Sequence, residues 1–255
     1  MRKPRIYCSA NLANVPHVML DEDTSKYIAR VLRLKPGAPI FIFNEQDGEF
    51  EATVTSVERR STTICLGQAC ENRTESPIHL TLIQGVSRGE RMDYTLQKST
   101  ELGVNAIIPL ITERSVVKLE EDRATKKHKH WQSILISACE QCGRANIPTI
   151  TTPATFEEWL EGEKKNTGDI AQQPTRLVLD PLSTNVLSNI MMTDHNVSLL
   201  IGPEGGLSPH EISSVKNVGF IPVKIGPRIL RTETASIAAI AAIQTLWGDF
   251  SRQAD

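Results

Sequence analysis

Two glycine-containing loops near the C-terminus carry the residues whose types and spacing could do chemistry. The first loop reads Gly202-Pro203-Glu204-Gly205-Gly206, and the second starts at Gly226 and runs on through Ile229-Leu230-Arg231-Thr232-Glu233-Thr234-Ala235. Glycine lets the backbone approach a ligand closely and present its N–H and C=O groups. Such a surface suits a flat heteroaromatic group such as adenine. Because a short apolar run precedes each loop, we expect one pocket at the ends of parallel strands.

Neither loop has the pattern of a phosphate-binding loop. No Gly-Lys-Ser/Thr follows either one, as a Walker A loop requires, and the Gly-x-Gly-x-x-Gly dinucleotide pattern is missing as well. These differences argue against a P-loop NTPase and against a dehydrogenase. Two ordinary strand-to-helix turns are the simpler alternative. It would be favoured for one loop alone, but it is disfavoured for two loops that carry Pro-Glu-Gly-Gly and Leu-Arg-Thr-Glu-Thr-Ala.

The elements that must position these loops alternate between strand and helix from residue 78 onward. We expect strands at 79–85, 104–110, 177–179, 197–201 and 221–225, with helices at 90–102, 122–142 and 234–247. This alternation predicts an α/β domain. Residues 1–70 instead show short strands around one helix at 22–33, which predicts a small barrel. The segment 70–77 is polar and ends in proline, which is typical of a domain boundary. We therefore expect two domains, 1–72 and 73–255.

The expected helix at 234–247 has almost no polar face. A helix that is apolar all round is buried, so its own domain or a second subunit must cover it. No apolar stretch is long enough to cross a bilayer, and no signal peptide is recognisable at the N-terminus. The odd number of cysteines, five, fits reduced thiols and therefore a cytoplasmic location.

Charge is distributed unevenly, although the net charge is only −2. The first 35 residues hold seven lysines and arginines against three acids. Lys26, Arg30 and Arg33 recur at i, i+4 and i+7, so they would share one face of a helix. That face is either a solvated surface or a stripe that contacts phosphates.

Motifs along nearly the whole chain resemble those of one family. They are the two loops above, Tyr27-Ile28-Ala29-Arg30-Val31-Leu32-Arg33-Leu34-Lys35-Pro36-Gly37, Gln97-Lys98-Ser99-Thr100-Glu101-Leu102-Gly103-Val104, Glu113-Arg114-Ser115 and Glu140-Gln141-Cys142-Gly143-Arg144. On these residues the chain resembles the RsmE family of SPOUT-class RNA methyltransferases. Two positions depart from the family pattern: Arg88 stands where lysine is usual, and Cys142 stands where serine is common.

The resemblance implies a fold, an activity and partners. The implied fold is α/β, a C-terminal SPOUT α/β-knot methyltransferase domain with a trefoil knot, preceded by a small N-terminal PUA-like β-barrel that binds RNA. The implied activity is S-adenosyl-L-methionine-dependent methylation of N3 of a specific uridine in 16S ribosomal RNA of the small ribosomal subunit, a step in ribosome biogenesis. The family is homodimeric, so a dimer interface would cover the apolar last helix.

The expected site residues follow from this reaction. Uracil N3–H is weakly acidic, so its proton must leave and the developing negative charge must be stabilised. The predicted catalytic residues are Arg231, Glu204, Arg144 and Glu140. The predicted cofactor-binding residues are Leu179, Ile201, Gly202, Pro203, Glu204, Gly205, Ile225, Gly226, Ile229, Leu230, Arg231, Thr232, Thr234 and Ala235. The predicted RNA-binding residues are Arg2, Arg5, Lys26, Arg30, Arg33, Arg88 and Arg114.

Simpler structural roles stand beside these. Glu140 and Arg144 could form a helix-end pair, and Thr232 and Thr234 could cap the last helix. No metal is expected, because His128 lies about three helical turns, ~16 Å, from the Cys139 and Cys142 pair. Two other functions remain open: an RNA-binding ribosome-assembly factor with an inactive methyltransferase fold, and a SPOUT enzyme acting on transfer RNA or another ribosomal site. The sequence alone gives neither the target nucleotide, nor the general base, nor whether naked RNA or an assembled subunit is the substrate.

Overall fold

The computed structural model describes residues 3–116, 121–165, 174–192 and 194–251 and divides the chain into two compact units. The first unit combines Met1–Glu75 with Ile136–Ile147, and the second combines Ser76–Leu135 with Pro148–Asp255. The division falls close to the expected boundary after residue 72. The segment Ile136–Ile147, however, joins the first unit, which no pattern in the sequence indicates. The domains 1–72 and 73–255 therefore stay a prediction.

The first unit is built on a mixed five-stranded sheet. Its strands are β1 (Arg5–Tyr7), β2 (His17–Leu20), β3 (Pro39–Asn44), β4 (Gly48–Val57) and β5 (Thr62–Cys70), in the order β1-β3-β4-β5-β2. β1 pairs with β3 in parallel, and the other pairs are antiparallel. Alternate residues of β3 and β4, including Ile40, Ile42 and Val54, point into one buried core. β3 and β4 form a hairpin that closes at Gly48, which has φ +84°.

The helix expected at 22–33 is shorter than predicted. α1 spans Glu22–Lys26, and a single π-helical turn follows at Tyr27–Val31. Arg33 then adopts φ +52°, which ends the helical path. Leu32 and Leu34 pack against the core, and the changed winding allows both to do so. The expected i, i+4, i+7 face of Lys26, Arg30 and Arg33 is therefore wrong.

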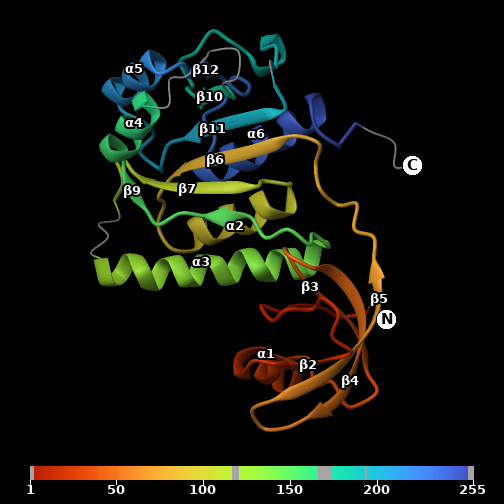
Figure 1. The fold of residues 1–255 in the computed structure, drawn as a ribbon. Helices are drawn as coiled ribbons and strands as arrows, with labels where there is room; N and C mark the ends of the chain where they lie inside the picture. Colours follow the sequence, from red (N-terminus) through yellow and green to blue (C-terminus); the bar gives the residue numbers. More distant parts are fainter. Residues whose placement is uncertain (1–2, 117–120, 166–173, 193, 252–255) are drawn as a thin grey trace. The chain divides into compact units, whose positions relative to one another are not determined.

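The second unit is built on a parallel seven-stranded sheet. Its strands are β6 (His79–Gly85), β7 (Ala106–Ile111), β8 (Thr149–Ile150), β9 (Ala154–Thr155), β10 (Thr175–Leu179), β11 (Asn196–Ile201) and β12 (Ile221–Val223). They follow the order β12-β10-β11-β6-β7-β8, with β9 also pairing with β7 (Figure 1). The expected strands of this half are confirmed, apart from shifts at their ends.

Helices cover the parallel sheet. They are α2 (Glu90–Glu101), α3 (Glu121–Cys142), α4 (Phe156–Lys165), α5 (Pro209–Asn217) and α6 (Thr232–Leu246), with a short 3-10 turn at Leu187–Asn189. Ile83 of β6 belongs to the core that α4 and α5 share with the sheet. The next residue, Gln84, points to the other face, where it bonds to α6. α2 and α6 pack against each other, as Figure 1 shows.

Local signals fix several helix ends. Ser208 and Glu211 form a capping box at the start of α5, with Pro209 in the first turn. Gly103 follows α2 at φ +86°, as a C-terminal glycine should. No helix among the described residues combines the length and the apolar composition that a membrane span requires.

Candidate functional site

A cavity of about 410 Å³ opens where three neighbouring parallel strands end. Leu179 ends β10, Ile201 ends β11 and Val223 ends β12, and all three line the cavity. The loops that follow these strands, the first turn of α6, Ile212 of α5 and Arg114 after β7 form the rest of its wall. Because β10 lies between β11 and β12, the two glycine loops stand on either side of the loop that follows β10. A cavity of this size fits a cofactor-sized organic ligand.

Close backbone contacts make glycine necessary in the first loop. A Cβ on Gly202 would lie 2.8 Å from the backbone of Gly206 and Leu207. A Cβ on Gly85, at the end of β6, would lie 2.4 Å from the nitrogen of Pro203. Backbone cannot yield as a flexible side chain can, so a side chain at either position would displace the loop.

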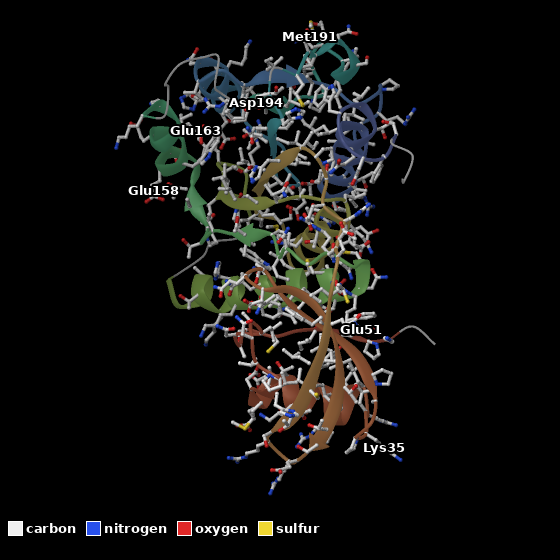
Figure 2. All side chains as sticks on the ribbon, turned by 45° about the vertical axis from the view of Figure 1, so that its right-hand side comes forward. Lys35, Glu51, Glu158, Glu163, Met191 and Asp194 are labelled. Carbon is white, nitrogen blue, oxygen red and sulfur yellow. The ribbon has the colours of Figure 1, made fainter. Side chains whose placement is uncertain are left out.

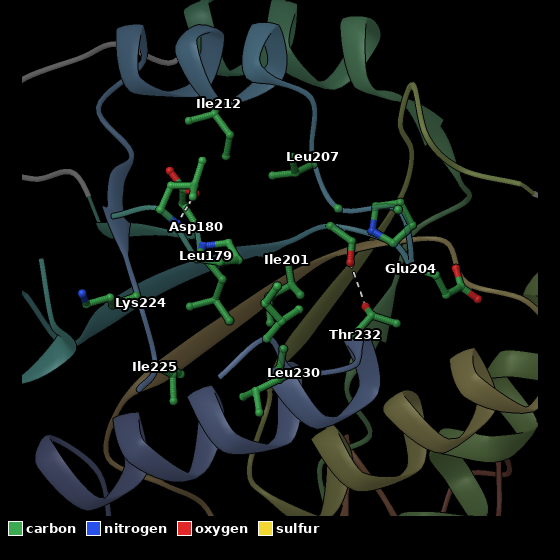
Figure 3. Close-up of a pocket in the computed structure, with 18 of the residues that line it drawn as sticks. Leu179, Asp180, Ile201, Glu204, Leu207, Ile212, Lys224, Ile225, Leu230 and Thr232 are labelled. Carbon is green, nitrogen blue, oxygen red and sulfur yellow. Dashed lines mark hydrogen bonds between the residues drawn. The ribbon is translucent and has the colours of Figure 1, made fainter. Parts of the chain in front are cut away.

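A buried chain of hydrogen bonds holds the first loop to α6. Ser236 Oγ donates to Gln84 Oε1 at 2.6 Å, and Gln84 Nε2 donates to Thr232 Oγ1 at 3.0 Å. Thr232 Oγ1 then donates to the carbonyl of Gly202 at 2.7 Å, as Figure 3 shows. The hydroxyl of Thr232 is therefore used to position the loop, and Arg231 rather than Thr232 occupies the N-cap of α6.

Glu204 fixes the same loop on its other side. Its Oε1 accepts hydrogen bonds from Arg88 N at 3.0 Å and from Arg91 Nη1 at 3.1 Å, while Oε2 is buried without a hydrogen-bond partner among the described residues. Burial raises the pKa of Glu204, but the bonds from Arg88 and Arg91 outweigh it and hold the pKa below its usual range. A carboxylate with a lowered pKa is a weak base, which argues against Glu204 as the proton acceptor.

Twelve of the residues expected to bind a cofactor line this one cavity. They are Leu179, Ile201, Gly202, Pro203, Glu204, Gly205, Ile225, Gly226, Ile229, Leu230, Thr232 and Ala235. The other two, Arg231 and Thr234, are exposed on the first turn of α6 and do not line it. The cofactor roles of all of these residues stay a prediction.

The cavity also has polar lining residues that the sequence did not single out. Asp180, Lys224 and Arg228 belong to this group. Arg114, expected to bind RNA, lines the cavity too, and its Nη1 donates to the carbonyl of Gly205 at 3.1 Å. The position of Asp180 directly after the expected strand 177–179 does predict that it lies at the carboxyl end of the sheet.

Arg144 and Glu140, expected to be catalytic, have structural contacts in the first unit. Arg144 is buried and pairs with Glu75, with Nη2 to Oε2 at 2.7 Å. Glu140 accepts from the backbone nitrogen of Tyr7 at 3.0 Å, and burial raises its pKa.

Arg5, expected to bind RNA, is buried in the same unit. Its guanidinium makes two bonds to Glu49, at 3.0 and 2.9 Å, and donates to the carbonyls of Cys139 and Arg144. It also stacks on the ring of Phe43 at 4.3 Å. Arg5 therefore has the contacts of a structural arginine, and an RNA contact by its side chain is not compatible with them.

The remaining predicted RNA-binding residues differ in how exposed and how paired their side chains are. Lys26 pairs with Glu22 at 2.9 Å, whereas Arg30, Arg33 and Arg88 are exposed. The side chain of exposed Lys35 projects outward beyond the π-helical turn (Figure 2). Arg2 lies outside the described residues. Among the residues the structure describes, no group of three or more histidine, cysteine or acidic side chains is placed to hold a metal ion.

Comparison with known proteins assigns both parts of the chain. A family described as an RNA methyltransferase domain matches residues 74–244, and one described as an RNA methyltransferase PUA domain matches residues 20–64. A ribosomal RNA small subunit methyltransferase E from Buchnera aphidicola is 38% identical over 98% of this chain and 99% of its own. The Bacillus subtilis protein of the same name is 27% identical, over 91% of each chain.

Solved structures agree with the sequence relatives. A ribosomal RNA small subunit methyltransferase E from Neisseria gonorrhoeae, bound to S-adenosyl methionine, superposes with a TM-score of 0.88 at 38% identity, covering 98% of this chain and 100% of the other. A putative methyltransferase from Legionella pneumophila in complex with the same cofactor gives 0.90 at 36% identity, with the same coverage. The expected fold, a PUA-like domain followed by an α/β-knot domain of the SPOUT class, is confirmed. By sequence and by structure, the chain belongs to the ribosomal RNA small subunit methyltransferase E family.

Proposed function

We propose that this chain transfers the methyl group of S-adenosylmethionine to N3 of a specific uridine in 16S ribosomal RNA of the small ribosomal subunit. The observation that carries the proposal is the cavity at the ends of β10, β11 and β12, together with membership of the family. The cavity combines aliphatic walls, exposed backbone at strand ends and a glycine, Gly202, at which a Cβ would meet backbone at 2.8 Å. This surface suits the adenine of the cofactor better than a polyphosphate.

The residues of the cavity fit S-adenosylmethionine in their chemistry. Leu179, Ile201 and Leu230 offer apolar contacts to a flat base, and Figure 3 shows them together in the middle of the cavity. Gly202 and Gly226 leave the backbone accessible on either side. When bound there, the cofactor supplies a methyl group on a positively charged sulfur. What the chain must add is the alignment of the uracil and the exclusion of competing water.

Arg231 is the residue we propose to act on the uracil. It lies between Leu230 and Thr232, which both line the cavity, and it is exposed. Its guanidinium has no hydrogen-bond or ion-pair partner among the described residues, so it is free to meet a substrate. A positive charge near the uracil carbonyls would stabilise the negative charge that develops when N3 loses its proton. Glu204, by contrast, is proposed to position the loop.

For RNA contacts we propose the exposed arginines Arg30, Arg33 and Arg88.

We further propose that the protein assembles as a homodimer. The support for the dimer is α6, where Ile237, Ala238 and Ala241 stay only partly buried within the chain and Leu246 is exposed. A second copy would cover these apolar side chains. Since the substrate is ribosomal RNA, we propose that the protein works in the cytoplasm.

The test is methyl transfer with an identified product. Purified protein, labelled S-adenosylmethionine and small subunits lacking the modification are incubated, and the RNA is digested to nucleosides for mass spectrometry. We expect 3-methyluridine from the wild type and a strongly reduced rate from Arg231→Ala. A near-wild-type rate for Arg231→Ala would refute the role of that arginine. Cofactor binding by calorimetry without any transfer would favour the inactive assembly factor, and a label on transfer RNA alone would favour the other SPOUT activity.

A further inference from the structure

Asp180 brings a carboxylate into a cavity that is otherwise walled mostly by aliphatic side chains and backbone. It is the first residue after β10, next to Leu179, and it is half-buried. The other lining carboxylate belongs to Glu204. Figure 3 shows Asp180 and Glu204 at opposite ends of the residues drawn, so the two serve different parts of the cavity.

The position of Asp180 is fixed by its own loop. Its backbone nitrogen donates to Val223 O at 3.0 Å, and its carbonyl accepts from Ser183 N at 3.0 Å. Its side-chain Oδ1 accepts from Leu182 N at 2.9 Å, which closes an Asx turn. The two backbone bonds fix the main chain at Asp180, and the bond from Leu182 N orients its carboxylate.

The second oxygen of Asp180 is not used by the chain. Oδ2 has no hydrogen-bond or ion-pair partner among the described residues, although Lys224 and Arg228 line the same cavity. A carboxylate oxygen can only accept hydrogen bonds at neutral pH, so a ligand group that meets it must be a donor. Preorganised acceptors of this kind cost little to use, because no rotamer has to be frozen on binding.

S-adenosylmethionine has three kinds of donor: the adenine amine, the ribose hydroxyls and the ammonium of its amino-acid end. The apolar strip of Leu179, Ile201 and Leu230 is the part of the wall that suits the base. The ribose is bonded directly to the base, whereas the ammonium is at the far end of a flexible chain. A carboxylate one residue from the strip is therefore best placed for the sugar. An acid near a strand end serves the ribose in dinucleotide-binding folds for the same reason.

Resting on the proposed function, we propose that Asp180 is a cofactor-recognition residue whose Oδ2 accepts a hydrogen bond from a ribose hydroxyl of S-adenosylmethionine. The residue thereby selects a ribonucleoside and orients its sugar. Asp180→Asn is the informative variant, because asparagine keeps the acceptor oxygen of the Asx turn but replaces the free carboxylate oxygen with an amide NH₂.

The test is calorimetry with S-adenosylhomocysteine and with 5′-methylthioadenosine, which keeps the base and the ribose but lacks the amino-acid end. We expect Asp180→Asn to weaken the binding of both ligands by about tenfold, the loss typical of a hydrogen bond to a charged group. Asp194→Asn is the matched control. Asp194 (Figure 2) also accepts from a backbone nitrogen, that of His195, but it does not line the cavity. The control should bind within about twofold of the wild type.

A change in the ligand makes the test independent of how well the variant folds. The 2′-deoxy and 3′-deoxy forms of 5′-methylthioadenosine should bind the wild type more weakly than 5′-methylthioadenosine itself. For the form that lacks the hydroxyl bonded to Asp180, this loss of affinity should disappear in Asp180→Asn. Equal affinities of wild type and Asp180→Asn would overturn the inference. So would a loss confined to S-adenosylhomocysteine, because Asp180 would then meet the ammonium. Failure of the wild type to bind any of these ligands would contradict the proposed function instead.

Discussion

The hydroxyl of Thr232 gives the sharpest test of how the cavity is built. Thr232→Val keeps the shape of the side chain and removes its hydroxyl. Two hydrogen bonds disappear, one to the carbonyl of Gly202 and one from Gln84. Both Gln84 and Ser236, which completes the chain of bonds, are fully buried. Water therefore cannot readily replace what is lost.

The magnitude follows from these two bonds. At about 1 kcal/mol each, Thr232→Val should lower the free energy of unfolding by about 2 kcal/mol, and by more where Gln84 is left partly unpaired. For a chain of this size that is a fall in Tm of about 4–8 °C. The loop at Gly202 also loses its anchor to α6, so the affinity for S-adenosylhomocysteine should fall as well.

Two control variants separate the hydroxyl from other effects. Thr232→Ser keeps the hydroxyl and should stay near the wild type in both measurements. Thr245→Val removes an exposed hydroxyl on the same helix, one that bonds only to the carbonyl of Ala241, and should change stability by less than about 0.5 kcal/mol. Scanning calorimetry gives Tm and titration calorimetry gives the affinity. If Thr232→Val matched Thr232→Ser in both, the proposed anchoring of the loop would be refuted.

Three further predictions concern Gly202, Glu204 and Cys142. Gly202→Ala should reduce S-adenosylhomocysteine binding by more than about tenfold, because its Cβ would meet backbone at 2.8 Å. Gly162→Ala, with open space around it in α4, should bind normally, and equal affinities for the two variants would contradict the reasoning. Glu204→Gln should lower Tm at pH 7. Because the folded pKa of Glu204 is lowered, the stabilisation exists above the ordinary glutamate pKa and is lost as the pH falls through the folded value. The two proteins should therefore converge once the pH is below the folded pKa, and a constant gap would argue against this reasoning. The hydrogen bond from Cys139 and the nearby Arg144 lower the pKa of Cys142 to about 6, despite burial. Iodoacetamide should therefore modify Cys142 before Cys139 with a midpoint near pH 6, and a midpoint at the ordinary value of about 8.5 would show the lowering is absent.

The parts of the fold that depend on local patterns could be predicted from the sequence. The strand His79–Gly85 is an apolar run between turn residues, and the capping box of Ser208 and Glu211 needs only three residues of spacing. The glycine loops could also be predicted, because their pattern is local in sequence. Once each loop was placed after a parallel strand, the meeting of both at one edge of the sheet followed from topology.

The parts that depend on distant packing could not be predicted. The π-helical turn at Tyr27–Val31 is followed by Leu32 and Leu34, which both pack against the core, and no local periodicity in the sequence indicates this change of winding. Arg5 belongs to a basic N-terminal segment, which is typical of RNA contacts. Its side chain instead donates to the carbonyls of Cys139 and Arg144, which lie more than a hundred residues away in sequence. A buried arginine and an RNA-binding arginine look alike until those partners are known.

The central claim is methylation of one uridine at N3, and mapping of the modified position tests it most directly. Small subunits and naked 16S ribosomal RNA, both lacking the modification, are incubated with the protein and S-adenosylmethionine, and the products are sequenced by mass spectrometry of RNase fragments. We expect one added methyl group, on N3 of a single uridine, and its loss with Gly202→Ala. Methyl groups spread over several nucleotides, on ribose or on another base, or no transfer to either substrate by a protein that binds the cofactor, would contradict it.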